Sequence, residues 1–153
     1  MISLFALPAL LVLFVDLVLG FFVLFMNPGS NGARGFSLMC FVTALLAFCE
    51  FQFQSAESYE RAYFWLRAGG IWPLVGMVYV AFALIYVRRE ALLRSWITIL
   101  LLYLPAAAWT VLDTATDWMI VPLRTELGWS YEPVEPTWPG DLSLIWGLGS
   151  MVV

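Results

Sequence analysis

Long apolar runs separated by short polar segments dominate the chain. About twenty apolar residues in a helix are needed to cross the hydrocarbon core of a bilayer. Four runs reach that length, and a shorter apolar segment follows them near the end of the chain. The pattern predicts an all-α integral membrane protein, a polytopic helix bundle with four full transmembrane helices and the start of a fifth, at about 3–26, 35–53, 62–87, 92–112 and 142–153.

The connections between these spans carry turn and capping signals. The stretch "NPGSNGAR" (27–34) is rich in the residues that form tight turns. Ser55 or Ser58 is expected to cap the third helix. That helix contains Gly69, Gly70 and Pro73, which indicates either a deformable element beside a ligand pocket or ordinary close packing of helices.

Residues 113–141 differ from the rest of the chain. They hold four prolines, three tryptophans and six acids against one arginine. This composition is too polar to span and too aromatic for a simple linker. We expect an ordered outer loop on the membrane surface, with Trp118, Trp129 and Trp138 at the level of the lipid headgroups.

The last apolar segment, 142–153, is too short to span. Twelve helical residues reach about 18 Å, against about 30 Å of hydrocarbon. We therefore expect residues 1–153 to be an incomplete domain, the first part of a longer protein.

Composition narrows the functional classes. The chain is 63% hydrophobic and 12% charged, with no histidine and a mean hydropathy of +0.90, so lipid is its natural solvent. All seven basic residues are arginine, and the absence of lysine excludes a retinal Schiff base. Without histidine the commonest general base and metal ligand are missing, so we predict no catalytic residues, no metal and no cofactor. The net charge of −4 gives no sign of nucleic-acid binding.

Arginine placement predicts the orientation. The connections at 27–34 and 88–94 contain four arginines, whereas those at 54–61 and 113–141 contain two. The N-terminus and the long loop are therefore expected outside, in a multi-pass protein of the plasma membrane.

Three charged residues, Arg67, Glu50 and Asp16, lie away from the ends of predicted spans. Arg67 stands about five residues inside the third span and Glu50 about three residues before the end of the second. Consecutive helices are usually neighbours, and an unpaired charge in the bilayer costs on the order of 3 kcal/mol. We therefore expect Glu50 and Arg67 to pair, lining an outward-facing cavity; the alternative is an arginine that snorkels to the headgroups.

Asp16 lies near the middle of the first span, with Gly20 one turn later on the same face. It is expected either to join two helices by a hydrogen bond or to serve a functional site. Cys40 and Cys49 are nine positions apart, about half a turn out of phase, and are expected on opposite sides of one helix rather than in a disulfide.

Several segments resemble a known family. They are "NPGSNGARGFSLMCF" at the second span, "ERAYFWLRAGGIWPL" in the third, "YVRR" at its end, and an outer loop with Gly128-Trp129 and Pro139-Gly140. Together they resemble the N-terminal seven-helix membrane region of bacterial sensor histidine kinases, over about the first four and a half helices.

This resemblance implies a membrane sensor module that relays a stimulus to cytoplasmic kinase domains, which are missing from this chain. It implies the lipid bilayer as surroundings and a homodimer for the full-length protein. The candidate signal-sensing residues are Arg67, Glu50, Asp16 and Trp118. Two alternatives stay open: a small proton-coupled exporter that uses Asp16, and a structural subunit of a larger membrane complex.

Overall fold

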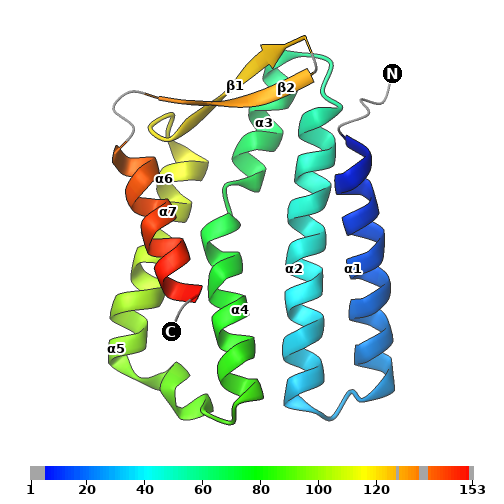
Figure 1. Ribbon diagram of the computed structural model, residues 1–153, viewed down its shortest axis with the longest axis vertical. Coiled ribbons are helices and arrows are strands. Elements are labelled where there is room, and N and C mark those ends of the chain that lie inside the picture. The colour runs from blue at the N-terminus through cyan, green and yellow to red at the C-terminus, as the bar shows by residue number, and fades with distance from the viewer. Residues whose placement is uncertain (1–5, 127, 135–137, 152–153) are drawn as a thin grey trace.

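The computed structural model describes residues 6–126, 128–134 and 138–151. Its helices run antiparallel to one another in a row, and a β-hairpin crosses one end of the bundle (Figure 1). The elements are α1 (Ala6–Met26), α2 (Asn31–Gln54), α3 (Tyr59–Gly69), α4 (Trp72–Tyr86), the 3₁₀ helix η1 (Glu90–Arg94), α5 (Trp96–Thr98), the π-helical η2 (Ile99–Tyr103), α6 (Leu104–Ala115), β1 (Ile120–Thr125), β2 (Gly128–Pro133) and α7 (Trp138–Met151).

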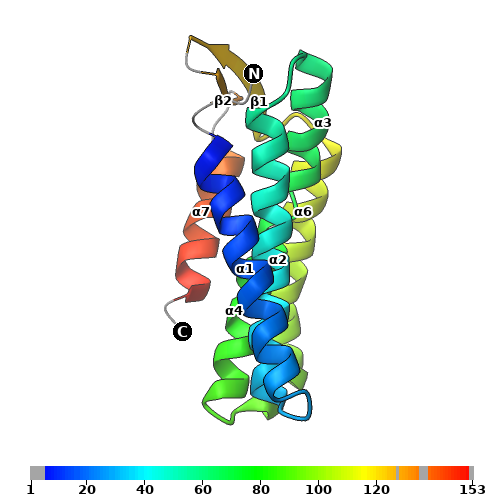
Figure 2. The same cartoon turned by 90° about the vertical axis from the view of Figure 1, so that its right-hand side faces the viewer.

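Among the described residues, four helical segments are long and apolar enough to cross a membrane: 6–26, 31–54, 59–86 and 96–115. Consecutive segments pack against each other, and α7 packs against α4. Viewed from the side, α1 and α7 lie on the same side of the row (Figure 2). The expected helix bundle is confirmed, while residues 3–5 and 152–153 lie outside the described part of the chain.

The third span is interrupted, as its glycines and proline suggested. α3 ends at Gly69 and α4 begins at Trp72, with Pro73 in the first turn of α4. A proline there has no amide hydrogen to lose, so it starts the new helix at little cost. The expected single helix over 62–87 is therefore two helices in line, which begin three residues earlier, at Tyr59.

The fourth span is irregular as well. It starts with the short α5, continues as the π-helical η2, and becomes α-helical again one residue before Pro105. The proline ring clashes with a regular α-helix on its N-terminal side, and the wider π-turn accommodates it. Its last helix reaches Ala115, so Asp113 belongs to the span and not to the outer loop.

Serine side chains cap the N-termini of two helices. Ser58 caps α3, with its Oγ 3.4 Å from the backbone nitrogen of Arg61, so the second of the two expected residues is the one used. Ser30 caps α2 through the backbone nitrogen of Ala33 in the same way. Each serine oxygen accepts from an amide hydrogen that has no partner within its helix.

Residues 120–125 and 128–133 form an antiparallel β-hairpin within the segment that was expected to be an ordered outer loop. Arg124 pairs with Trp129 and Thr125 with Gly128 across the two strands. Trp129 was expected at the headgroups, but it is only 7% exposed and its Nε1 donates to the carbonyl oxygen of Ala56 at 2.7 Å. It belongs to a small core with Phe53, Ala62 and Leu66, so the hairpin is packed onto the α2–α3 turn.

Helices α1 and α2 approach each other closely at Gly20. A Cβ at this position would lie 2.7 Å from Phe41 Cε1 and 3.1 Å from the Cβ of Cys40, so the backbone of α1 at Gly20 lies directly against side chains of α2. Cys49 faces the other way, because its Cβ lies 3.7 Å from the position of a Cβ on Gly69. The two cysteines are buried, free and directed at different helices.

Candidate functional site

Helix α3 presents two adjacent faces to two different neighbours. Ala62 and Leu66, four positions apart, pack with Phe53 of α2. Tyr63 and Arg67, each one position later, lie on the adjacent face, because successive side chains on a helix are about 100° apart. That second face is directed at the end of α6 and the start of the hairpin.

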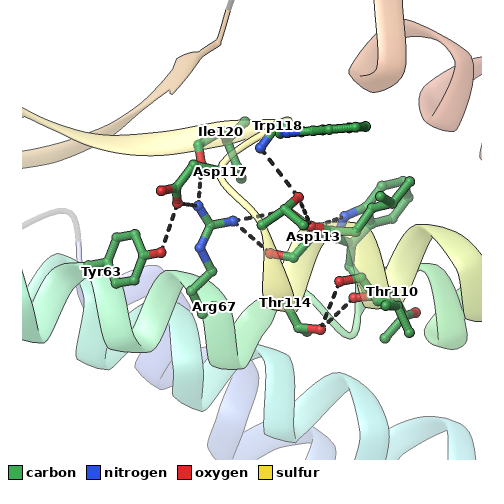
Figure 3. Close-up of polar contacts among 12 residues, drawn as sticks. Tyr63, Arg67, Thr110, Asp113, Thr114, Asp117, Trp118 and Ile120 are labelled. Atoms are coloured by element: carbon green, nitrogen blue, oxygen red, sulfur yellow. Dashed lines mark hydrogen bonds and ion pairs between the residues drawn. The ribbon is translucent and has the colours of Figure 1, made fainter.

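Arg67 is the centre of a polar network at this junction (Figure 3). Its Nη1 donates to the carbonyl oxygen of Asp113 at 2.6 Å, and its Nη2 donates to the Asp117 carboxylate and to the carbonyl oxygen of Ile120 at 3.0 Å. Its guanidinium carbon lies 4.9 Å from the centre of the Tyr63 ring. Although it is a charged residue in a predicted span, Arg67 is only 8% exposed, so it does not snorkel; it joins α3, α6 and β1.

Asp113 is the buried partner of Arg67. Its side chain is 2% exposed, and its Oδ1 lies 3.9 Å from Nη1 of Arg67. Trp72 Nε1 donates to the other oxygen, Oδ2, at 2.9 Å. A Cβ on Gly70 would lie 3.2 Å from the backbone carbon of Asp113 and 3.0 Å from Cγ2 of Thr114. The break between α3 and α4 is therefore held directly against the end of α6.

The predicted pair of Glu50 and Arg67 is wrong. Glu50 accepts hydrogen bonds from Gln54 Nε2 at 2.9 Å and from the Tyr131 hydroxyl. The pairing fails because α2 contacts the Ala62/Leu66 face of α3, whereas Arg67 is on the face turned toward α6. Glu50 thus links α2 to strand β2 by a hydrogen bond, and Arg67 links α3 to strand β1 in the same way.

The two hairpin contacts differ in their response to pH. The hydrogen bond from the Tyr63 hydroxyl at 2.8 Å, together with the nearby guanidinium of Arg67, holds the pKa of Asp117 below its usual range. Burial, and then the hydrogen bond to Glu50, raise the pKa of Tyr131. Tyr131 therefore remains a hydrogen-bond donor at neutral pH, and Asp117 remains a carboxylate.

A cavity of about 770 Å³ lies beneath the hairpin, in the same half of the bundle. Its lining is mainly apolar and comes from α1, α2, α3, α4, α6, α7 and both strands. Polar groups reach it from Glu50, Asp113 and Tyr131. This volume falls within the range of ordinary small-molecule sites. Hairpin and cavity together form the candidate site.

The other predicted residues lie apart from this cavity. Asp16 is not among the described residues that line it; it lies near Cys40 on α2. Within the described ranges Asp16 makes no hydrogen bond or ion pair, so the expected hydrogen bond between helices is not formed. Trp118 is 62% exposed, and its ring is directed away from Arg67 (Figure 3). In the part of the chain that the structure describes, no group of three or more metal-ligating side chains gathers.

Sequence reasoning missed Asp113, Asp117 and Tyr131. Asp113 and Asp117 are four residues apart in "DTATD", at the depth where the third span carries its lone arginine. That spacing, with the alternation of spans, was a usable signal for the Arg67 partners. Tyr131 had no such signal, because only the hairpin register brings it to Glu50.

The bundle of membrane-crossing helices makes this chain a polytopic integral membrane protein. The family model described as the N-terminal 7TM region of histidine kinase matches residues 8–141, and the chain belongs to this family. The resemblance found in the sequence is thereby confirmed. No curated protein and no solved structure matches the chain.

Proposed function

We propose that this chain is the membrane-embedded input module of a histidine kinase, a part that senses a stimulus and does not itself catalyse. Residues 1–153 would be an incomplete sensor domain that relays the stimulus to cytoplasmic kinase domains, in a protein that acts as a homodimer. Family membership supports the setting. The observation that carries the proposal is the hairpin, which covers a cavity and is hydrogen-bonded to α2, to α3 and to the turn between them.

The hydrogen bonds between the hairpin and the helices support a route by which binding in the cavity changes the helix packing. A ligand that changes the packing of the cavity also changes the contacts of Glu50 with Tyr131 and of Asp113 with Arg67, since Glu50, Tyr131 and Asp113 line the cavity. The two irregular stretches lie in neighbouring spans: the break after Gly69 in the third, where Gly69 and Gly70 line the cavity, and the π-helical turn before Pro105 in the fourth, toward the opposite end of the bundle. Discontinuous helices are suited to a two-state rearrangement that a ligand biases.

The orientation belongs to the same proposal. The end of the bundle that carries the hairpin has Arg61 and Arg124 in its connections, and the opposite end has Arg34, Arg88, Arg89 and Arg94. Because arginine-rich connections stay in the cytoplasm, the hairpin, the cavity and the N-terminus face outward across the bacterial plasma membrane.

The test is autophosphorylation of the complete protein that contains this chain, assayed with ATP in membranes. Asp117→Asn and Tyr131→Phe each release one hairpin contact, and Glu132→Gln changes an exposed residue of the same hairpin. We expect both releasing variants to shift the basal rate in the same direction by at least about fivefold, the lower end of usual coupling energies. Glu132→Gln should leave it unchanged. Equal rates in all three variants would contradict a sensory role for the hairpin.

A further inference from the structure

The cavity beneath the hairpin has a definite chemistry. Two of its lining residues, Glu50 and Asp113, are acids, and none of its described lining residues is basic. The charge of Asp113 is balanced by Arg67, which does not line the cavity and whose Nη1 lies 3.9 Å from Oδ1 of Asp113. Glu50 accepts hydrogen bonds from a neutral amide and a neutral phenol, and within the described ranges no cation forms an ion pair with it. The cavity therefore carries negative charge on the side of α2.

Aromatic rings surround this charge. Trp65, Trp72, Phe53 and Tyr131 all line the cavity. The rings of Phe53 and Tyr131 are stacked, with centroids 5.0 Å apart, next to the hydrogen bond between Tyr131 and Glu50. Aromatic faces attract cations, most strongly where water is excluded. A carboxylate beside several rings is the arrangement that favours a positively charged group attached to an apolar body.

We infer that the cavity binds a hydrophobic cation, an amine or quaternary ammonium compound whose charge lies against Glu50 and whose apolar part fills the space between α1, α3 and α7. This inference rests on the proposed function and names the class of its ligand. An anion is disfavoured because it would approach two carboxylates with no lining cation. A neutral apolar ligand is disfavoured because it would strip water from Glu50 without supplying a countercharge.

The test uses tetraphenylphosphonium and tetraphenylborate, two ions of the same shape and opposite charge. Binding of each to the complete protein in lipid nanodiscs is measured by equilibrium dialysis, with protein-free nanodiscs as the blank for partition into lipid. We expect saturable binding of the phosphonium and none of the borate. Equal binding of the two ions would overturn the inference in favour of a merely apolar site. No saturable binding of either ion would also overturn it, as expected if further helices fill the space.

Variants assign the charge to its residue. Glu50→Gln keeps the size of the side chain and one acceptor oxygen but removes the charge, and it should weaken phosphonium binding about tenfold. Glu57→Gln, an exposed acid outside the cavity, is the matched control and should bind as the unmodified protein does. Equal affinity in Glu50→Gln and Glu57→Gln would refute the role of Glu50. If Glu50→Gln does not fold, the preference between the two ions in the unmodified protein still decides the question.

The sensory role of the hairpin and the binding of a cation in the cavity can be refuted independently of each other. The autophosphorylation assay on the hairpin variants needs no added ligand, so it can support a sensor whose cavity binds no cation. Conversely, phosphonium binding with an unresponsive kinase would retain the ligand class and remove the sensory role.

Discussion

Replacing Arg67 by methionine is the sharpest test of the junction between α3, α6 and the hairpin. Methionine keeps a long apolar stem but removes all three hydrogen bonds of the guanidinium and its ion pair with Asp113. The carboxylate of Asp113 is then left 2% exposed without its countercharge.

The magnitude follows from this burial. Two unit charges 3.9 Å apart attract by about 4 kcal/mol at an effective dielectric constant of about 20. Removing one partner of a buried pair typically costs about 3–5 kcal/mol, because the other charge stays buried. Asp117 differs, since its side chain is 60% exposed. Asp117→Asn should therefore cost no more than about 1 kcal/mol.

The assay is reversible unfolding in mixed micelles with increasing dodecyl sulfate, followed by tryptophan fluorescence. Arg61→Met is the matched control, since Arg61 is exposed on the same helix and should change stability by less than about 0.5 kcal/mol. The double variant Arg67→Met with Asp113→Asn should be more stable than the sum of the single effects predicts, because the uncompensated charge is gone. A loss below about 1 kcal/mol in Arg67→Met, or strict additivity, would refute the buried pair.

Three further predictions concern packing, pH and orientation. Gly70→Ala should destabilise the protein by about 1–3 kcal/mol in the same dodecyl sulfate unfolding assay, because its Cβ would press on Thr114 and on backbone. Gly76→Ala, whose Cβ would meet nothing within 4 Å, is the control and should be neutral or slightly stabilising. The folded-state pKa of Asp117 is lowered, so its contribution to stability is complete above the unfolded-state pKa of about 3.9 and is lost as the pH falls through the folded-state pKa. The difference in stability between the unmodified protein and Asp117→Asn should therefore be constant between pH 8 and 5 and vanish on further acidification. A difference that instead changed near pH 6–7 would contradict this assignment. A membrane-impermeant maleimide added to whole cells should label Glu132→Cys but not Arg89→Cys, against a silent background because both native cysteines are buried; the reverse pattern would invert the orientation.

The hairpin links elements that are separate in sequence. Trp129 joins it to the α2–α3 turn, Tyr131 to α2, and the segment from Asp117 to Ile120 to α3. A displacement of the hairpin therefore acts on several helices at once. The prolines and the π-helical turn leave the third and fourth spans less regular than α1 and α2, so these two spans are the elements most able to respond.

The sequence predicted some components of the candidate site but not the contacts between them. The arginine of the third span, the acidic residue of the second span and a cavity near them were predicted, and the structure contains each of them. The contacts of Arg67 and Glu50 were not predicted, because the adjacency of the second and third spans in the sequence suggested that Arg67 contacts α2. Arg67 and Leu66 differ by one position on α3, and that step of about 100° decides which neighbouring helix each one meets.

The sequence by itself determined the number of spans, their approximate bounds and the family, because a bilayer imposes length and hydrophobicity on each helix separately. Tertiary structure alone decided the partners of Arg67 and Glu50, the burial of Trp129 and the cavity. These depend on the rotation of each helix about its axis and on the register of the hairpin, and both are set by contacts between segments far apart in the chain. Local patterns constrain each element, but which faces meet is a property of the packed whole.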